Sequence, residues 1–385
     1  KTGAPPATSA CLSAAAWSRL DGARPRPASI GWVLGDMAAK DVVLLGEQHD
    51  VADDHRWQVQ TLAVLHAQRP QMAIGFEMFP RRLQPVLDRW VAGELTARQF
   101  IEQSGWDSVW GLPAELYLPI FEFARMNRIP MLALDIDGKL SKAIAEKGWD
   151  AVAAAEREGV SRPAPPSAAY RDFLQEIYRQ HPALDSGHGA KAEADAHGDK
   201  SAAERGFVRF VESQTARDRA MAEAIAGRAG RAGAGPLIVG IMGNGHLRFG
   251  WGVPHQLRDL GVKKVGILMP MSVETDCASI GTGMADAVFA LPKQAEAPPE
   301  PPRLGVRLDS DKGAVSVAEV TPGSLAEKTG LKAGDRLLRV ADQPVNKVTQ
   351  VIAAVRRQPG GTWLPIQVRR GDATVDLVAK FPAVP

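Results

Sequence analysis

The sequence predicts an α/β protein, with a three-layer domain of mainly parallel sheet and flanking helices and a small β-rich domain after it. Short apolar runs occur at residues 42–45, 72–76, 130–134 and 237–242, two of them ending at a glycine turn and two at a carboxylate. Helical patterns fill the intervals between these runs, and such alternation indicates βαβ units and a parallel sheet. A proline-rich stretch at 292–302 then separates the two domains.

Apolar periodicity places the individual elements. Helices are expected at residues 13–20, 30–40, 53–68, 80–90, 96–103, 115–127, 139–158, 168–180, 207–228 and 254–260. Thr96 is expected to cap one of them, and Pro70 to end another. Two further strands are expected at 265–268 and 284–291, the second as an edge strand.

The predicted domain boundaries follow from these patterns. Residues 1–27 form an N-terminal extension, 28–291 the α/β domain, 292–302 the linker and 303–385 the second domain. The chain starts at Lys1 in a stretch rich in Thr, Ala, Pro and Ser, which is compatible with a removed export signal.

Composition argues against nucleic acid as a partner and against a membrane-spanning segment. The 385 residues include 46 basic and 44 acidic side chains, a net charge of +2 that gives no electrostatic case for nucleic acid. No apolar run reaches the 18 residues or so that span a membrane.

The two cysteines, Cys11 and Cys277, leave two alternatives open. Lone cysteines far apart in sequence are often buried thiols. A disulfide between them would suit an oxidising compartment.

Two copies of Gly-x-x-His follow apolar strands, Gly46-Glu-Gln-His49 and Gly243-Asn-Gly-His246. Glu47, Glu77 and Asp135 also follow strands directly. The carboxyl ends of parallel strands line one crevice where ligands bind. Because unpaired buried charges are costly, these side chains are expected to pair with each other, with a metal or with a ligand.

One chemistry for this site is a divalent transition metal (Fe, Zn, Mn or Cu) with an open coordination position. The proposed ligands are His49, Glu77 and His246, with Glu47 and Asp135 as additional or supporting groups. Such a metal could activate water, with Glu77 or Glu47 as the general base of a hydrolase.

The other chemistry is haem, whose axial ligand is an imidazole or a tyrosine phenolate. Tyr117, Tyr170 and Tyr178 are the candidate phenolates. Arg217 would pair with a haem propionate or with a strand-end carboxylate. Three histidines in a Gly/Ala/Asp-rich stretch at 181–197 either bind metal or haem, or belong to a solvated insertion.

The second domain resembles a PDZ domain of the kind found in exported proteases. The matching residues are Leu304-Gly305-Val306, the run 320–330 and Gly334-Asp335. The resemblance implies that a peptide binds as an added strand, with its terminal carboxylate at Leu304–Val306. The alternative is a PDZ domain that docks only against its own first domain.

The first domain resembles the ChaN-like haem-binding proteins of the Tiki and erythromycin-esterase-like superfamily. The resemblance rests on the two Gly-x-x-His motifs and on four segments. These are Gly75-Phe-Glu-Met-Phe79, Gly105-Trp-Asp107, Tyr117-Leu-Pro with Ala124-Arg125, and Gln214-x-x-Arg217-Asp218-x-x-Met221-Ala222. It implies a three-layer α/β fold, export, often a lipid anchor, haem or iron uptake, tyrosine ligation and dimers around stacked haems. The Tiki branch implies instead a metal-dependent peptidase using His49, His246 and Glu77.

The sequence departs from the ChaN pattern in two places. Asp135-Ile-Asp137 stands where Asn is expected, which adds negative charge and favours a cation. Cys11 would be a lipidation site only if residues 1–10 belonged to a signal, and they lack its apolar region.

The leading hypothesis is an exported haem- or metal-binding protein, periplasmic or associated with the outer membrane as a lipoprotein, that acts in uptake or homeostasis of haem, iron or another metal. Its PDZ domain binds a peptide or a protein C-terminus, and the ChaN resemblance implies a homodimer. The alternatives are a metal-dependent peptidase supplied by the PDZ domain, and a PDZ-centred scaffold.

Overall fold

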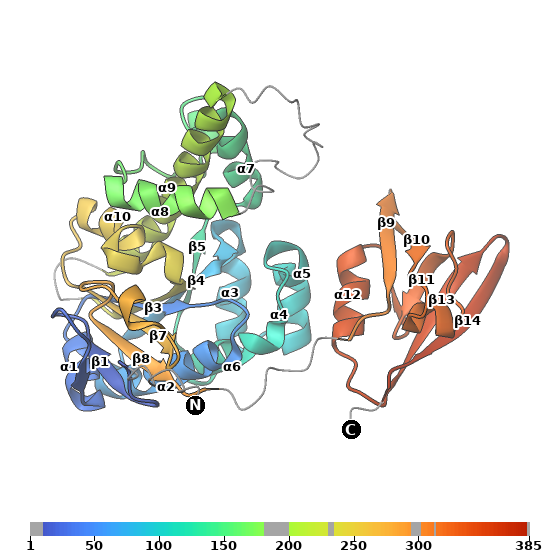
Figure 1. Ribbon diagram of the computed structural model, residues 1–385, viewed down its shortest axis with the longest axis horizontal. Helices are drawn as coiled ribbons and strands as arrows, with labels where there is room; N and C mark the ends of the chain where they lie inside the picture. The colour runs from blue at the N-terminus through green and yellow to red at the C-terminus, as the bar shows by residue number, and fades with distance from the viewer. Residues whose placement is uncertain (1–10, 181–199, 230–234, 294–301, 312, 383–385) are drawn as a thin grey trace, which may run out of the picture. The chain divides into compact units, whose positions relative to one another are not determined.

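The computed structural model describes residues 11–180, 200–229, 235–293, 302–311 and 313–382 (Figure 1). The chain divides into two compact units. The first contains residues up to Lys293 except 106–113, and the second contains 294–385 together with 106–113. His181, His188 and His197 lie outside the described residues. Within the described parts, no helix is long and apolar enough to cross a membrane.

The first unit is built on an eight-stranded sheet in the order β2-β1-β8-β7-β3-β6-β4-β5. Its strands are β1 (Trp17–Arg19), β2 (Arg26–Ala28), β3 (Val42–Glu47), β4 (Met72–Pro80), β5 (Met131–Asp135), β6 (Leu237–Gly243), β7 (Val265–Ser272) and β8 (Ala287–Leu291). All neighbours from β8 to β5 are parallel, and only β1 and β2 are antiparallel. The predicted mainly parallel sheet is therefore confirmed.

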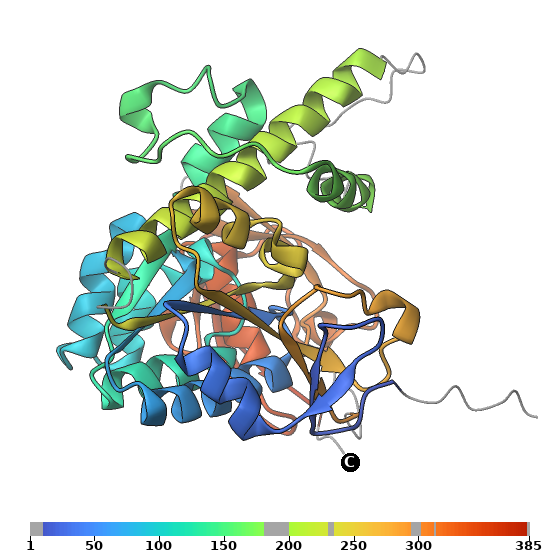
Figure 2. The same ribbon diagram turned by 90° about the vertical axis from the view of Figure 1, so that its left-hand side faces the viewer.

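Helices cover both faces of the sheet (Figure 2). One layer contains α1 (Ile30–Ala38), α2 (Ala52–Gln68), α3 (Gln84–Val91), α4 (Ala97–Ser104) and α6 (Leu118–Met126). The other contains α7 (Gly138–Lys147), α8 (Ala168–Gln180), α9 (Lys200–Ala229) and α10 (Val253–Asp259). Because both faces are covered, every residue of β3, β4 and β6 is buried, as is usual for parallel strands.

Local sequence explains where several helices start and stop. The Thr96 hydroxyl oxygen accepts a hydrogen bond from the Gln99 backbone N–H, and the Gln99 side-chain oxygen accepts one from the Thr96 backbone N–H, which confirms the predicted cap of α4. The helix predicted over 139–158 stops at Lys147, because Gly148 has φ +84° and breaks the helical conformation.

The N-terminal stretch differs from its prediction. The helix expected at 13–20 is wrong, since Trp17–Arg19 form β1 and pair with β8. The strand near 284–291 is consequently not an edge strand, because β8 lies between β7 and β1. Trp17 packs against Trp57 and Phe289, so contacts made far along the chain override the local helical pattern.

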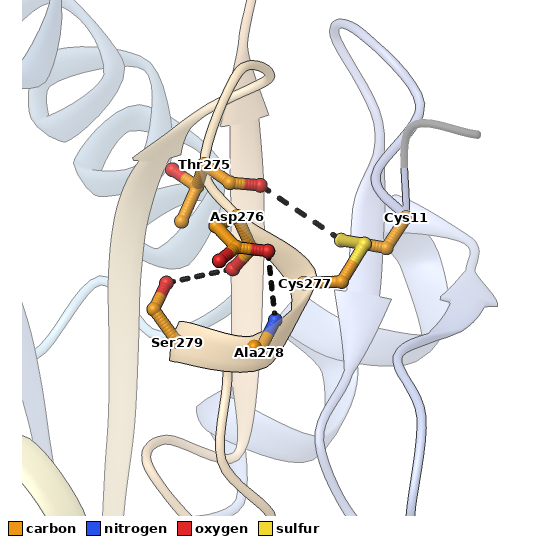
Figure 3. The surroundings of a disulfide bond; sticks show 6 residues. All are labelled: Cys11, Thr275, Asp276, Cys277, Ala278 and Ser279. Atoms are coloured by element: carbon orange, nitrogen blue, oxygen red, sulfur yellow. Dashed lines mark hydrogen bonds between the residues drawn. A yellow bond between two sulfur atoms is a disulfide. The ribbon is translucent and has the colours of Figure 1, made fainter. Parts of the chain in front are cut away.

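A disulfide joins Cys11 to Cys277, whose Cα atoms lie 5.6 Å apart (Figure 3). The bond holds the segment before β1 to the short 3-10 helix η7 (Cys277–Ser279). Asp276 caps that helix by accepting a hydrogen bond from the Ala278 backbone N–H at 3.1 Å. Of the two alternatives left by the sequence, the structure has the disulfide rather than two buried thiols.

The second unit contains an antiparallel sheet in the order β14-β13-β11-β10-β9, with β12 paired to β11. Its strands are β9 (Val306–Asp311), β10 (Ala314–Val320), β11 (Arg336–Val340), β12 (Gln343–Pro344), β13 (Trp363–Arg370) and β14 (Ala373–Lys380). Its helices are α11 (Leu325–Thr329) and α12 (Val348–Arg356), and the short α5 (Trp106–Val109) is grouped with this unit. Aliphatic side chains from the sheet and both helices form its own core, so the unit is a β-rich domain as predicted.

Removal of the disulfide should destabilise the first unit. We expect Cys11→Ser/Cys277→Ser to lose about 2–5 kcal/mol of unfolding free energy, because the link restricts the unfolded chain across 266 residues. Thermal unfolding with and without a reductant measures this. The double variant should be insensitive to the reductant, and a melting temperature equal to that of the oxidised wild type would contradict the prediction.

Candidate functional site

The two Gly-x-x-His turns lie side by side at one edge of the sheet. β3 and β6 are parallel neighbours, with Gly46 opposite Met242 and Glu47 opposite Gly243. The turns that follow therefore leave the sheet together. A Cβ atom added at Gly243 would lie 2.8 Å from Cε1 of His49, so the absence of a side chain there lets the imidazole pack against the neighbouring strand.

Glu47 is the centre of a first hydrogen-bonded cluster, and it is almost completely buried. Its Oε1 accepts from the Tyr117 hydroxyl at 2.6 Å and lies 2.8 Å from Nδ1 of His49. Its Oε2 accepts from the Gln58 amide at 2.9 Å. Burial alone lowers the pKa of His49, but the Glu47 and Glu77 carboxylates outweigh it, so the pKa lies above its ordinary value.

Glu77 and Arg217 form the start of a second cluster. Arg217 donates to Glu77 at 2.8 Å and to Asp135 at 2.5 and 2.8 Å, which joins the ends of two strands. The other oxygen of Glu77 accepts from the Gly243 backbone N–H at 2.7 Å. Burial raises the pKa of Glu77, but the neighbouring His246 and Arg217 hold it well below its usual range.

His246 extends the second cluster to Tyr170. Its Nδ1 lies 2.6 Å from Asp218 and its Nε2 lies 3.3 Å from Glu77. Burial lowers the pKa of His246, but these two carboxylates raise it to about 10, so the imidazole is protonated at neutral pH. Tyr170 donates its hydroxyl to the other oxygen of Asp218 at 2.8 Å. Burial and this carboxylate raise the pKa of Tyr170 well above its ordinary value.

A cavity of about 290 Å³ opens over these clusters. Its polar side contains Glu47, His49 and the turn from Gly243 to His246. Its apolar wall comes from α8 and α9, on which Tyr170, Leu174, Ile177 and Phe210 face the cavity, together with Gln214. The His49 side chain is 39% exposed, whereas that of Glu47 is fully buried.

The site residues predicted from the sequence fall into three groups: residues that line the cavity, residues of the second cluster, and two tyrosines outside both. Glu47, His49, His246 and Tyr170 line the cavity. Glu77, Asp135 and Arg217 are joined to each other in the second cluster, where Arg217 pairs with the strand-end carboxylates. Tyr117 is completely buried against Glu47, and Tyr178 packs between Phe207 and Phe210.

The metal hypothesis finds no support in this arrangement. Among the described residues, no three or more His, Cys, Asp or Glu side chains are placed to hold an ion. The physical reason lies in the second cluster, where the Arg217 guanidinium already binds Glu77 and Asp135. The two carboxylates beside His246 raise its pKa, and a metal would have to displace the proton that they stabilise, because only the neutral imidazole is a ligand.

Sequence reasoning missed three residues that complete the clusters. Asp218 was noted only as part of a family motif, although it binds both His246 and Tyr170. His55 and Gln58 lie on the buried face of α2. His55 is hydrogen-bonded to the backbone carbonyl of His49, and Gln58 donates to the Glu47 carboxylate. Their signal in the sequence is a pair of polar residues three positions apart on a helix face that otherwise packs inward.

The second unit contains the backbone features of a peptide-binding edge. β9 is an outer strand of its sheet, and α12 packs beside it. Just before β9, Leu304 accepts a hydrogen bond from the Ala326 backbone N–H at 2.7 Å. Gly305 has φ +79°, and an added Cβ atom would collide with Ser324, so this turn requires glycine.

Comparison with known families assigns both units. The family model described as haem-binding uptake, Tiki superfamily, ChaN matches residues 33–257, more than half of the chain. The PDZ domain model matches residues 302–380. Both predicted resemblances are therefore confirmed.

A solved structure of ChaN from Campylobacter jejuni, described as showing cofacial haem binding, is similar to the first unit. It shares 16% sequence identity over 71% of this chain and 96% of that chain, with a TM-score of 0.52, which shows a common fold. The HtrA3 PDZ domain bound to a phage-derived ligand shares 22% identity over 20% of this chain and 82% of that chain, with a TM-score of 0.19.

One curated relative, named "Putative zinc metalloprotease RSc1411" from Ralstonia nicotianae, is 40% identical over 57 residues. The match covers 15% of this chain, and the chain spans only 12% of that relative.

The raised pKa of His246 predicts a loss of stability at alkaline pH. The pKa of His246 is about 10 in the folded protein, against an ordinary value of 6.5. Its contribution to the unfolding free energy is therefore complete below pH 6.5 and disappears as the pH rises towards 10. The unfolding free energy should fall by roughly 1.4 kcal/mol per pH unit between about pH 7 and 9.5. Chemical denaturation across this window measures the slope.

A matched pair of variants isolates this effect. His246→Gln should flatten the slope, whereas His66→Gln, at the far end of α2, should not. Burial raises the pKa of Asp54 to about 7, so its own contribution is still changing at pH 7 and is nearly constant above about pH 8, where the slope reports His246. A wild-type curve that is flat from pH 7 to 9.5 would sink the prediction.

Proposed function

Since the chain belongs to the ChaN family of haem-binding uptake proteins in the Tiki superfamily, we propose that its first domain binds haem in the cavity above β3 and β6. The cavity itself carries the proposal, because an apolar wall faces a partly exposed imidazole there. Few precisely placed polar groups in a mostly apolar pocket are the usual features of a cofactor site.

His49 is the residue best placed to be the axial ligand of the haem iron. Its ring forms part of the cavity wall and is partly exposed. Glu47 holds Nδ1, and Glu47 is in turn held by Tyr117 and Gln58. Carboxylates that orient a ligating histidine through its other nitrogen fix the ring and increase its basicity. The bound iron would supply the open coordination position that this imidazole fills.

Tyrosine ligation stays a prediction, and the three tyrosines differ in how well they suit it. Tyr170 lines the cavity, but its hydroxyl is committed to Asp218 and its raised pKa favours the protonated phenol. Tyr117 is buried behind Glu47 and does not line the cavity. Tyr178 is half-buried in the aromatic cluster beside the cavity wall.

The volume of the cavity limits how much of a haem it can enclose. At about 290 Å³ it lies at the lower end of the range of roughly 300–1,000 Å³ for small-molecule pockets. We propose that this cavity would hold only part of a haem, so that the rest of the macrocycle would extend beyond it. This would agree with the cofacial binding described for the Campylobacter jejuni protein, and the homodimer stays a prediction.

We also propose that the protein is exported and acts in haem uptake at the cell envelope. The Cys11–Cys277 disulfide supports an oxidising compartment. The metal-dependent peptidase is disfavoured, because Glu77 is bound to Arg217 and the backbone of Gly243, and so is not arranged as a general base on metal-bound water.

Haemin titration tests the haem site. Wild-type protein should give a Soret shift that saturates with haemin, and His49→Ala should abolish the spectrum of the ligated form. Glu47→Gln keeps the shape of the side chain but removes its charge, and should weaken binding by roughly 10–100-fold.

His66→Ala is the matched control, since this histidine lies outside the cavity. Tyr170→Phe and Tyr178→Phe separate the two kinds of ligation. If a tyrosine variant loses the ligated spectrum while His49→Ala keeps it, the assignment to His49 is wrong. If no haemin binds to the wild type, haem binding itself is refuted.

For the PDZ domain we propose recognition of a peptide C-terminus along β9. Peptides from a C-terminal library should bind with a free carboxylate, and the same peptides with an amidated end should bind at least about tenfold more weakly, because backbone N–H groups hold the carboxylate. Fluorescence polarisation with the full chain measures the ratio. Equal binding of the two forms would exclude recognition of the terminus.

A further inference from the structure

We infer that Arg248 is the anion-binding residue of the cavity and takes a carboxylate of the ligand, a propionate if the ligand is haem. The inference rests on the proposed haem-binding function and adds a specific contact to it. From the sequence, Arg217 was expected to pair either with a haem propionate or with a strand-end carboxylate, and here the propionate is assigned to Arg248 instead.

Arg248 lies beside the cavity on the side of His246. It begins the 3-10 helix η6 (Arg248–Gly250), two residues after His246 lines the cavity. Its guanidinium carbon lies 5.6 Å from the ring centre of Phe173 on α8. The ring of Phe173 stacks against Tyr170, another residue of the cavity wall, with 6.4 Å between ring centres. Arg248 is not itself a lining residue of the cavity, but its contact with Phe173 and its place two residues beyond His246 put the cation beside it.

This guanidinium is half-buried but has no acidic partner within the described part of the chain. Its Nε is buried and makes no hydrogen bond to any described residue. Burial alone lowers its pKa, and no carboxylate opposes that effect. Burying an unpaired charge is costly, so an arginine in this state is suited to an anion that arrives with the ligand.

Arg217 has the opposite surroundings. Glu77 and Asp135 both accept hydrogen bonds from it, and they raise its pKa further. A propionate would have to displace one of these carboxylates and leave it buried without a cation. Arg248 can bind a carboxylate without breaking any ion pair, and a guanidinium fork matches a carboxylate with two parallel hydrogen bonds.

The inference is tested with two probes that differ only at the carboxylates, haemin and haemin dimethyl ester, titrated in the same detergent-containing buffer. The wild type should bind haemin more tightly than the ester. Arg248→Met keeps an unbranched apolar side chain against Phe173 and removes the charge. It should weaken haemin binding by roughly 10–100-fold, leave ester binding unchanged, and so abolish the preference.

Two further variants control for charge and folding. Arg171→Gln removes an exposed arginine on α8 that lies over Phe207, and should leave the preference for haemin intact. Without ligand, Arg248→Met should melt at or above the wild-type temperature, because an unpaired charge is lost. Arg217→Met should melt lower, because it leaves two carboxylates without their cation.

The outcomes separate the inference from the function on which it rests. Equal weakening of haemin and ester by Arg248→Met, no weakening of either, or the same loss in Arg171→Gln, would overturn the role of Arg248 while haem binding stands. If the wild type binds neither probe, the proposed function fails and the inference fails with it.

Discussion

The parallel pairing of β3 with β6 is the constraint on which the site depends. It brings together two turns that are nearly two hundred residues apart in sequence, and places Glu47 opposite Gly243. Once the turns are adjacent, several ionisable side chains meet in a nearly dry region, where each must find an opposite charge or a hydrogen bond. The two clusters around Glu47 and Glu77 satisfy that requirement, and so they fix the orientation of both histidines.

The two histidines consequently have different chemical roles despite their matching motifs. His49 has one carboxylate at Nδ1 and a ring that is partly exposed at the cavity. His246 lies between two carboxylates and is buried, so it acts as a cation that neutralises them. A repeated motif therefore does not imply a symmetric two-histidine metal site, because α9 supplies a carboxylate, Asp218, to His246, whereas the carboxylate bound to His49 is Glu47 of β3.

Much of the fold could be predicted from local patterns, since the strands at 42–45 and 237–242 and the helix Ala168–Gln180 each show a strong period or apolar run. Convergence of the strand ends followed from the rule for parallel sheets. The predictions that failed, or could not be made, concern residues whose partners lie far away in the sequence. Trp17–Arg19 became a strand because β8 pairs with it. The partners of Arg217 and His246 could not be chosen from the sequence, because several carboxylates were available and only the packing of α9 selects among them.

Ion pairs and buried strands fix the polar side of the cavity, whereas apolar packing between α8 and α9 fixes its wall. The two sides should therefore differ in how easily they move when a ligand binds. The polar side stands on strands that are buried on both faces and is fixed by the paired charges below it. The wall belongs to a separate small aromatic and aliphatic cluster on α8 and α9, apart from the main core. Small satellite clusters open at lower free energy than the central sheet. Adjustment to a flat macrocycle should therefore occur in α8 and in the part of α9 around Phe210, while His49 and Glu47 keep their positions.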